Sequence, residues 1–445
     1  MYQLTESSLN VPRTNKPRVV VIGGGFGAVN FVQRLPEHDF QVVMLSKQNY
    51  HGFWPLLYQV ATASVQPESI AEPIRKLFRH HPDFHFRAVP ATSVDTGAKT
   101  VTTSLGVVPY DYLIIATGTQ ANYFGNEQIR QHAFVLKDLG DAVNLRSQLL
   151  QSLEQANVAQ EPALRQALLN IVIAGAGPTG VELAGSLSEM RRHVLPCDYP
   201  GLDFREMHIY LIDGASRVLN TLSLEASHQA QQDLEELGII VKLDELVTSY
   251  DGQNVTLRSG EQIAAQTLVW AAGVTGALIE GLPESAKARG RYLVNHFSQV
   301  RGYEEVFAIG DVALMKVDKW PGGHPQVAQP AMQQGRHLAS NFRRLLQGDA
   351  FEPFEYFNKG DLAVIGRSRA VGDLPGGYHL SGFVAWMSWL FVHIFFLIGF
   401  RNKVVVLIDW LYQLVTFQRS NRITILPLSR PSAIVEEETL HVGAR

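Results

Sequence analysis

The chain has 445 residues, 46% of them hydrophobic and 18% charged, so it is long enough for two or three globular domains and too apolar to be disordered. Its formal net charge of −4 gives no sign of a nucleic-acid partner, and we expect none. The single cysteine, Cys197, excludes an intramolecular disulfide and a redox-active cysteine pair, which removes the disulfide reductases and the sulfide oxidisers.

A glycine-rich motif follows the first apolar segment of the chain. Residues 1–17 are polar and lack the apolar stretch of a secretory signal, so we expect a short arm there. VVVIGGGFGAVN then places the strand Val19 to Ile22 before three small residues, Gly23, Gly25 and Ala28. Small residues let the backbone approach a pyrophosphate, and the helix that follows directs its N-terminal N–H groups at the phosphates. One such motif alone is equally compatible with a simple turn.

A second copy of the same plan makes a nucleotide-binding interpretation much stronger. IVIAGAGPTGVELAG places Gly175, Gly177 and Gly180 after an apolar strand, residues 171–174. Each copy is followed later by an apolar strand that ends in a small-residue turn, YLIIATG at 112–118 and TLVWAAG at 267–273. The repeat predicts an α/β fold with two Rossmann-like dinucleotide-binding domains, and electron transfer between two cofactors.

The residue that ends the second strand of each copy distinguishes the two sites. Asp213 ends the strand at 208–212, where its carboxylate can accept hydrogen bonds from the ribose hydroxyls of an adenosine and would repel a 2′-phosphate. This favours NADH over NADPH, although the nearby Arg217 leaves NADPH open. The first copy has Ser46 at this position, which can make one such bond without the charge. A solvated turn at the end of the strand is the alternative role for Asp213.

The order of these segments predicts how the domains are connected. Residues 161–170 form a linker and a short helix before the second motif, and the strand 306–309 returns to the first domain with Gly310 and Asp311. The second domain is therefore inserted into the first. We expect an arm at 1–17, a first nucleotide domain at 18–160 and 286–380, a second at 161–285, and a C-terminal region at 381–445.

The C-terminal region contains two apolar segments. Residues 383–400 form an apolar run of 18 residues that as a helix would be about 27 Å long, near the lower limit for crossing a bilayer. The second run, 404–417, is shorter and contains Asp409. We predict two helices lying in one membrane leaflet, with interfacial aromatic residues and headgroup-binding cations, namely Trp386, Trp389, Trp410, Tyr412, Arg401, Lys403, Arg419 and Arg422. A lone crossing helix, a buried hairpin and a homodimer seam are the alternatives.

Seven motifs together resemble the type II NADH dehydrogenases, the single-subunit NADH:quinone oxidoreductases. They are IGGGFGA, NYHGFWPLLYQVAT, PYDYLIIATGT, GAGPTGVELAG, WAAGV, VFAIGDVA and AQPAMQQG, and the resemblance extends from Arg18 to about Thr424. The glycine motifs occur throughout flavoproteins with two nucleotide domains, whereas PLLYQVAT and AQPAMQQG are more specific to this family.

The resemblance implies FAD at the first motif and NADH at the second. For FAD it implies contacts from Gly23, Gly25, Phe26, Gly27, Ala28, Ser46, Lys47, Ala116, Thr117, Gly118, Gly310, Asp311, Ala328 and Gln329. For NADH it implies contacts from Gly175, Gly177, Pro178, Thr179, Gly180, Glu182, Asp213 and Gly273. The loop 55–62 would pass along the flavin. Ser46 and Trp54 depart from the family pattern, which has an acid and a glutamine there, and this puts the adenosine contacts and the tunnel lining in doubt.

For the quinone side, the resemblance implies Gln329, Ala331, Gln333 and Lys359, with Glu182 near the nicotinamide and the flavin. Gln329 and Gln333 share a helix face at a spacing of four and offer neutral amides to a quinone carbonyl. From the residues alone, the two glutamines are more typical of an exposed helix start and Lys359 of a surface lysine, and only the resemblance reverses this. A structural carboxyl and a proton-handling carboxyl are equally compatible with Glu182.

The resemblance implies a catalytic function for the whole chain. We expect NADH to reduce FAD by hydride transfer and a quinone to take two electrons, without proton pumping, on the cytoplasmic face of the cell membrane as a peripheral, monotopic protein. No Cys/His cluster indicates a metal site. The alternatives are a soluble NAD(P)H-dependent reductase of a ferredoxin-like or rubredoxin-like protein, and a non-catalytic NADH-sensing flavoprotein.

Overall fold

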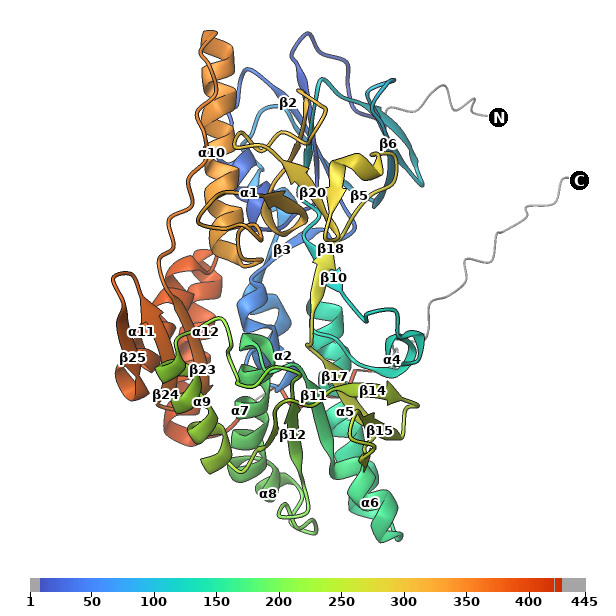
Figure 1. Ribbon diagram of the computed structural model, residues 1–445, viewed down its shortest axis with the longest axis vertical. Coiled ribbons are helices and arrows are strands. Elements are labelled where there is room, and N and C mark those ends of the chain that lie inside the picture. Colours follow the sequence, from blue (N-terminus) through green and yellow to red (C-terminus); the bar gives the residue numbers. More distant parts are fainter. Residues whose placement is uncertain (1–8, 420, 426–445) are drawn as a thin grey trace, which may run out of the picture. The chain divides into compact units, whose positions relative to one another are not determined.

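The computed structural model describes residues 9–419 and 421–425, which form two compact units (Figure 1). The first unit comprises 9–52, 71–120 and 274–359, and the second comprises 53–70, 121–273 and 360–425 without residue 420. The chain thus leaves the first unit for the second and returns to it, as expected for an inserted nucleotide domain. Parts of the predicted arm and tail, residues 1–8, 420 and 426–445, lie outside the described residues.

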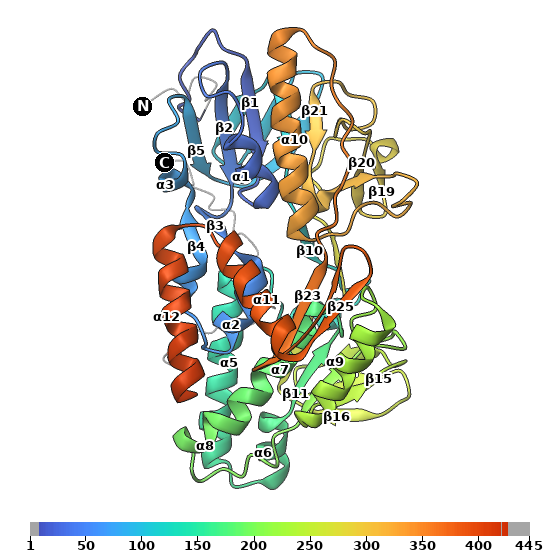
Figure 2. The same cartoon turned by 90° about the vertical axis from the view of Figure 1, so that its left-hand side faces the viewer.

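The first unit is built on a five-stranded parallel sheet with the order β21-β9-β1-β2-β5. These strands are β21 (Val306–Ala308), β9 (Tyr112–Ile115), β1 (Arg18–Ile22), β2 (Gln41–Ser46) and β5 (Phe84–Ala88). The strand β1 is central, so it is buried on both faces and reads as a continuous apolar run. The helix α1 (Phe26–Val32) packs against the long helix α10 (Ala328–Gln347), as both views show (Figure 2).

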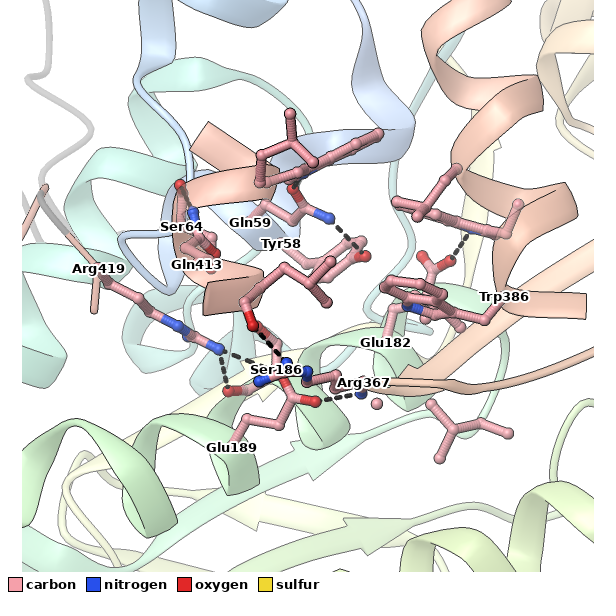
Figure 3. A pocket seen from close by; sticks show the side chains of 18 of the residues that line it. Tyr58, Gln59, Ser64, Glu182, Ser186, Glu189, Arg367, Trp386, Gln413 and Arg419 are labelled. Atoms are coloured by element: carbon pink, nitrogen blue, oxygen red, sulfur yellow. Dashed lines mark hydrogen bonds and ion pairs between the residues drawn. The ribbon is translucent and has the colours of Figure 1, made fainter. Parts of the chain in front are cut away.

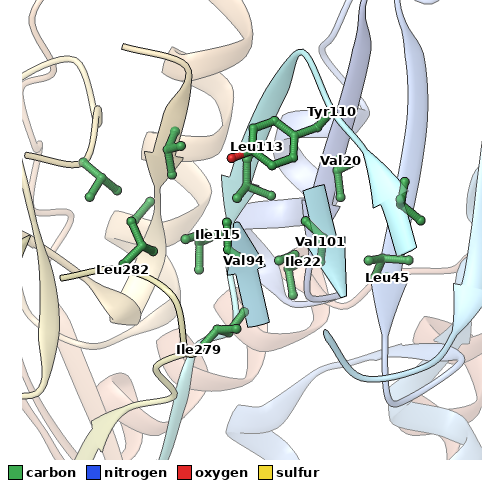
Figure 4. Close-up of a cluster of buried hydrophobic side chains, with 14 of the residues drawn as sticks. Val20, Ile22, Leu45, Val94, Val101, Tyr110, Leu113, Ile115, Ile279 and Leu282 are labelled. Carbon is green, nitrogen blue, oxygen red and sulfur yellow. The ribbon is translucent and has the colours of Figure 1, made fainter. Parts of the chain in front are cut away.

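A continuous apolar core stabilises the first unit (Figure 4). It joins side chains of the parallel sheet, such as Val20 and Ile115, to Val101 of an antiparallel sheet and to Ile279 and Leu282. That antiparallel sheet consists of β6 (Ala91–Asp95), β7 (Thr100–Thr103) and β8 (Gly106–Pro109). The smaller elements are β3 (Tyr50–Gly52), β4 (Ala71–Pro73), α3 (Ile74–Leu77), β10 (Thr119–Ala121), β18 (Val274–Gly276), β19 (Lys287–Ala288), β20 (Arg291–Val294) and β22 (Ala313–Met315).

The second unit has its own parallel sheet with the order β13-β12-β11-β17. Its strands are β13 (Ile240–Lys242), β12 (Ile209–Ile212), β11 (Ile171–Ala174) and β17 (Thr267–Trp270). The helix α7 (Pro178–His193) follows β11, and an antiparallel sheet follows β13, made of β14 (Val247–Tyr250), β15 (Asn254–Leu257) and β16 (Gln262–Ala264). The other helices here are α4 (Glu127–His132), α5 (Leu139–Val158), α6 (Pro162–Leu169), α8 (Leu195–Asp198) and α9 (Leu224–Glu236).

The C-terminal part of the chain completes the second unit. The antiparallel strands β23 (Asp361–Gly366), β24 (Arg369–Leu374) and β25 (Tyr378–Ser381) pack on α7 and α9. Gly185 of α7 makes this possible, because a Cβ there would lie 1.7 Å from the carbonyl oxygen of Ile365. Two helices follow, α11 (Gly382–Phe396) and α12 (Phe400–Thr416), and α2 (Leu57–Ala61) packs against α5 and α7.

The predicted strands and helices are found with small shifts at their ends, and the expected α/β fold is confirmed. The compact units place 53–70, 121–160, 274–285 and 360–380 differently from the expected domains. The segments 53–70 and 360–380 join the second unit because α2 and β23 pack on α7, and 121–160 joins it because α5 packs on α2 and α6. The domain boundaries given above therefore stay a prediction.

Candidate nucleotide sites and an apolar cavity

The glycine loop of the first unit is shaped by close backbone contacts. Gly23 has φ +113°, and a Cβ there would lie 2.2 Å from the carbonyl oxygen of Ala116, so a side chain cannot be accommodated. Gly25, the residue before α1, faces open space, since a Cβ there would meet nothing within 4 Å. This open side of the loop is where a pyrophosphate can approach the backbone. The buried Ser46 lies beside this loop, 3.4 Å from a Cβ on Gly24.

The other residues predicted at the FAD site lie in the same unit. Gly310 has φ +73° and its N–H donates to Oε1 of Gln334 at 2.7 Å. The Thr117 hydroxyl donates to the Ala277 carbonyl at 2.7 Å, which fixes the turn after β9. Asp311 is partly buried, whereas Lys47 is exposed. Gln334 was not among the residues predicted from the sequence. It is 2% exposed, and its side-chain amide holds the backbone at Gly310.

The glycine loop of the second unit repeats the first in detail. Gly175 has φ +110°, and a Cβ there would lie 2.4 Å from the carbonyl oxygen of Ala271. Gly180 packs against the loop itself, with a Cβ position 1.9 Å from the carbonyl oxygen of Gly175. Gly177, like Gly25, faces open space. The two loops therefore use glycine at matching positions for the same two reasons, a left-handed backbone and an open approach.

Asp213 is held at the second loop by two backbone donors. Its carboxylate accepts from the N–H of Ala176 at 2.6 Å and from the N–H of Ala215 at 2.7 Å. Each carboxylate oxygen retains a lone pair for a further donor. Arg217, which left NADPH open, donates to the carbonyls of Asn220, Leu222 and Ser223. Its guanidinium is thus used to hold the following turn.

The glutamines predicted on the quinone side bind the backbone of a neighbouring segment in the first unit. Gln333 donates to the Phe357 carbonyl at 2.9 Å and accepts from the Phe357 N–H at 3.1 Å. Oε1 of Gln329 accepts from the Lys359 N–H at 3.2 Å. The structure thus brings Gln329, Gln333 and Lys359 together, with the Lys359 side chain exposed. Ala331 is buried under Gly310.

A cavity of about 440 Å³ lies in the second unit between α7, β23 and the two C-terminal helices (Figure 3). Its walls are mainly apolar, from Trp386, Met387, Leu390, Leu411, Leu414 and Phe417. Its polar lining comes from α2, α7 and the end of α12, with Tyr58, Gln59, Glu182, Ser186, Glu189 and Arg419. Such a cavity suits a largely apolar ligand with a few polar atoms.

Glu182 is the predicted site residue that lines this cavity. It is 8% exposed and accepts a hydrogen bond from Nε1 of Trp389 at 3.3 Å. Burial raises the pKa of Glu182 to about 8, and hydrogen bonds from the Val364 backbone and Trp389 only partly oppose this. Glu182 therefore carries a proton at neutral pH, although its place near the start of α7 favours the anion.

A buried arginine forms the other polar part of the cavity. Arg419 is 5% exposed and donates to the carbonyls of Thr62 at 2.9 Å and Ser186 at 3.0 Å. Its guanidinium lies 3.5 Å from Oε2 of Glu189. Burial lowers the pKa of Arg419, and the charge of Glu189 partly offsets this. Arg419, three residues after the end of α12, is thus fixed on α7.

Comparison with known proteins identifies the family. A family model described as pyridine nucleotide-disulphide oxidoreductase matches residues 17–335, and the model of the NDH2 C-terminal domain matches 358–419. The type II NADH:quinone oxidoreductase Ndh of Mycobacterium tuberculosis is 34% identical, with 94% of this chain and 91% of that protein covered. The chain belongs to the type II NADH:quinone oxidoreductases.

Other relatives of this type II NADH:quinone oxidoreductase agree with the assignment. NdhA of the same bacterium is 35% identical, with 88% of this chain and 86% of that protein covered. The structure of NDH2 from Plasmodium falciparum in complex with NADH has a TM-score of 0.85 at 21% identity, covering 93% of this chain and 100% of that one. The sulfide:quinone oxidoreductase of Aquifex aeolicus shares the fold, with a TM-score of 0.68 at 19% identity over 92% of this chain and 96% of that one.

The C-terminal helices of this type II NADH:quinone oxidoreductase differ from two expectations. The helix α11 ends at Phe396, because Leu397 is extended and Gly399 has φ +89°. Among residues 9–419 and 421–425, no helix has the length and apolarity to span a membrane. Trp389 is 1% exposed and stacks on His393 at 3.8 Å between ring centroids, and Arg419 is buried. The sequence predicted both side chains at the membrane interface, and the structure instead places both in the interior.

Several residues of the cavity were not predicted from the sequence. Ser186 and Glu189 were missed, although they follow the predicted Glu182 at the spacing of one face of α7, so the polar pattern of this face was a usable signal. Tyr58 and Gln59 lie in the PLLYQVAT motif, which was expected only to pass along a flavin. Nothing in the local sequence indicated that Arg419 would reach α7.

Proposed function

We propose that this chain is a peripheral membrane enzyme that oxidises NADH and reduces a quinone, with FAD as its resident cofactor. The relatives named above support the reaction, since NADH and quinone are in their names. The observation that carries the proposal is an apolar cavity with a protonated carboxyl in its lining, in a chain with two matched glycine loops.

The first glycine loop fits FAD. Gly25 leaves the backbone open to a pyrophosphate, Gly23 allows the loop to pack against Ala116, and Gly118 and Gly310 have positive φ in the neighbouring turns. Ser46 would contact the adenosine ribose from the end of β2. FAD, when bound, supplies the redox chemistry by accepting a hydride from NADH and passing two electrons to the quinone. The protein contributes binding and orientation of the reacting groups.

The second glycine loop would bind NADH. Gly175, Gly177 and Gly180 shape the phosphate approach, and Asp213 would accept hydrogen bonds from the adenosine ribose. The carboxylate disfavours a 2′-phosphate, and Arg217 is held by three carbonyls. NADH is therefore preferred to NADPH.

The cavity would receive the quinone. Its apolar walls suit a lipid-soluble ring and tail, and Glu182 would deliver a proton to the oxygen atom that gains charge during reduction. Gln329, Ala331, Gln333 and Lys359 remain proposed contacts on the quinone side by resemblance. The amides of Gln329 and Gln333 also position the segment 357–359.

The C-terminal helices would attach the enzyme to a membrane surface. Large apolar side chains are exposed along both helices, including Phe383, Val384, Phe391, Phe395, Phe400, Ile408, Leu411 and Val415. Exposed apolar faces of this size mark interaction sites, and a membrane is where a lipid-soluble quinone is found. The cytoplasmic face of the membrane and a homodimer stay predictions.

Flavin spectroscopy with a quinone tests the proposal. The purified protein should contain stoichiometric FAD, NADH should bleach the visible flavin band without oxygen, and a quinone in liposomes should restore it. Protein without FAD would refute the proposal. Restoration by a ferredoxin-like protein but by no quinone would instead support the soluble reductase, and bleaching that neither acceptor reverses would support a sensor.

A further inference from the structure

A chain of three side chains connects the C-terminal helix α12 to the cavity. Nε1 of Trp410 donates to Oε1 of Gln59 at 2.7 Å, and Nε2 of Gln59 donates to the hydroxyl oxygen of Tyr58 at 3.0 Å. All three residues line the cavity, and Figure 3 shows the bond between Gln59 and Tyr58. Gln59 and Tyr58 are 8% and 5% exposed, so water does not readily replace these partners.

The direction of every bond in this chain is fixed by chemistry. An indole N–H can only donate, so the oxygen of the Gln59 amide must face Trp410. The amide nitrogen then faces Tyr58 and can only donate, which makes the Tyr58 oxygen an acceptor at this bond. The single hydroxyl hydrogen of Tyr58 is therefore directed away from Gln59.

The Tyr58 hydrogen has no acceptor among the side chains and backbone groups of residues 9–419 and 421–425. The hydroxyl groups of the neighbouring Thr62 and Ser186 are hydrogen-bonded to each other at 2.8 Å. The Thr62 hydroxyl also donates to the backbone carbonyl of Tyr58 at 2.9 Å. A buried hydroxyl group that keeps a free hydrogen at a cavity wall is poised for a ligand that supplies an acceptor.

We propose that Tyr58 donates a hydrogen bond to a carbonyl oxygen of the quinone, and that Gln59 and Trp410 fix the direction of this bond. This inference rests on the proposed function, because the cavity must take a quinone. Tyr58 is then a substrate-contacting residue, and Gln59 and Trp410 are positioning residues.

Tyr58 orients the quinone and keeps its own proton. Burial and the nearby Glu182 raise the pKa of Tyr58 well above its ordinary value, because a phenolate here would be poorly solvated and close to other acidic groups. Glu182, whose pKa lies near 8, is the group in this cavity that releases a proton more readily. The two side chains therefore have different roles. Tyr58 is a permanent hydrogen-bond donor that positions the quinone oxygen atom, and Glu182 is the acid that protonates it.

The arrangement also ties quinone recognition to the C-terminal hairpin. Trp410 belongs to α12, which also carries the exposed Ile408 outside the cavity lining. When Trp410 is removed, the Gln59 amide can rotate and offer its oxygen to Tyr58 instead. The hydroxyl hydrogen would then turn toward Gln59 and be lost to the ligand.

Half-reaction kinetics of the flavin-loaded enzyme test the inference. Tyr58→Phe should leave bleaching of the flavin by NADH unchanged and slow its reoxidation, by short-chain ubiquinone or menaquinone, by about 10-fold to 100-fold. Trp410→Phe should slow reoxidation in the same direction but less. Combined with Tyr58→Phe it should add nothing, because both changes remove the same bond. Tyr412→Phe, an exposed tyrosine on α12, is the matched control.

An infrared signature separates this role from a structural one. In the wild type, the carbonyl stretch of the bound quinone should be shifted to lower frequency, and Tyr58→Phe should move it back. Normal reoxidation in Tyr58→Phe, or a carbonyl band that does not move, would overturn the inference. If Tyr58→Phe lacks flavin, Trp410→Phe and its carbonyl band decide. A wild type that reduces neither quinone would refute the proposed function itself.

Discussion

Replacement of Glu182 by glutamine should change both the stability and the pH dependence of the enzyme. The pKa of this carboxyl rises from 4.5 to about 8 on burial. At about 1.4 kcal/mol per pH unit, the folded state disfavours the anion by on the order of 5 kcal/mol. Because the folded state binds a proton that the unfolded state has released, the free energy of unfolding falls as pH rises from about 4.5 to 8 and is flat above that.

The glutamine variant removes this titration, so its advantage over the wild type should grow with pH. We expect Glu182→Gln to be a few kcal/mol more stable than the wild type at pH 8.5, with the difference vanishing below about pH 4.5. Urea unfolding followed by circular dichroism at the two pH values measures this. The wild-type rate of flavin reoxidation by quinone should fall above pH 8, and the variant should be roughly 100-fold slower and independent of pH.

Glu189→Gln is the matched control, since it lies on the same helix and lines the same cavity but pairs with Arg419. It should keep the wild-type fall in reoxidation above pH 8, whatever its cost in stability. A wild-type rate that stays constant between pH 6 and 9, or a Glu182→Gln variant with the wild-type profile, would refute the assigned role of this carboxyl.

The remaining predictions concern the nucleotide, the membrane and the first unit. Asp213→Ala should weaken NADH binding by about tenfold and reduce the preference for NADH over NADPH, measured as the ratio of the two KM values. An unchanged ratio would argue against a contact between Asp213 and the ribose. Phe391→Ser with Phe395→Ser should lower liposome binding by about 10-fold to 100-fold in flotation assays, because both rings are more than half exposed. Leu105→Ser, an exposed leucine of the first unit, should have no effect, and equal binding by all variants would exclude α11 as the anchor. Gln329→Leu should slow quinone turnover more than flavin reduction by NADH, and equal losses would count against a quinone-side role.

Both glycine loops could be predicted because their requirements are local. A left-handed residue at Gly23 or Gly175 and an open approach at Gly25 or Gly177 follow from a strand, a tight turn and a helix within a few residues. The strands β1 and β11 were equally clear, since a central parallel strand is apolar on both faces. The family resemblance then assigned the cofactors to the loops, which local spacing cannot do.

The cavity could not be predicted because it depends on contacts between distant segments. Tryptophan is typical of a membrane interface, but Trp389 is buried, and its indole N–H donates to Glu182, which lies 207 positions earlier. Tyr58 and Gln59 belong to a recognisable motif, yet their role depends on Trp410, which lies 351 positions after Gln59. Composition of the apolar C-terminal runs predicted the helices but not which of their faces would be enclosed.

The position of Arg419 near the end of the described chain determines when its contacts can form during translation. Its guanidinium joins the segment after α12 to the carbonyls of Thr62 and Ser186, so this part of the cavity lining is completed only when residue 419 has been added to the chain. Both nucleotide folds can assemble on the ribosome well before that residue has been translated. A product that terminates before Arg419 would lack these hydrogen bonds and the ion pair with Glu189, so α7 and the segment around Thr62 would lose this link to the C-terminal part of the chain.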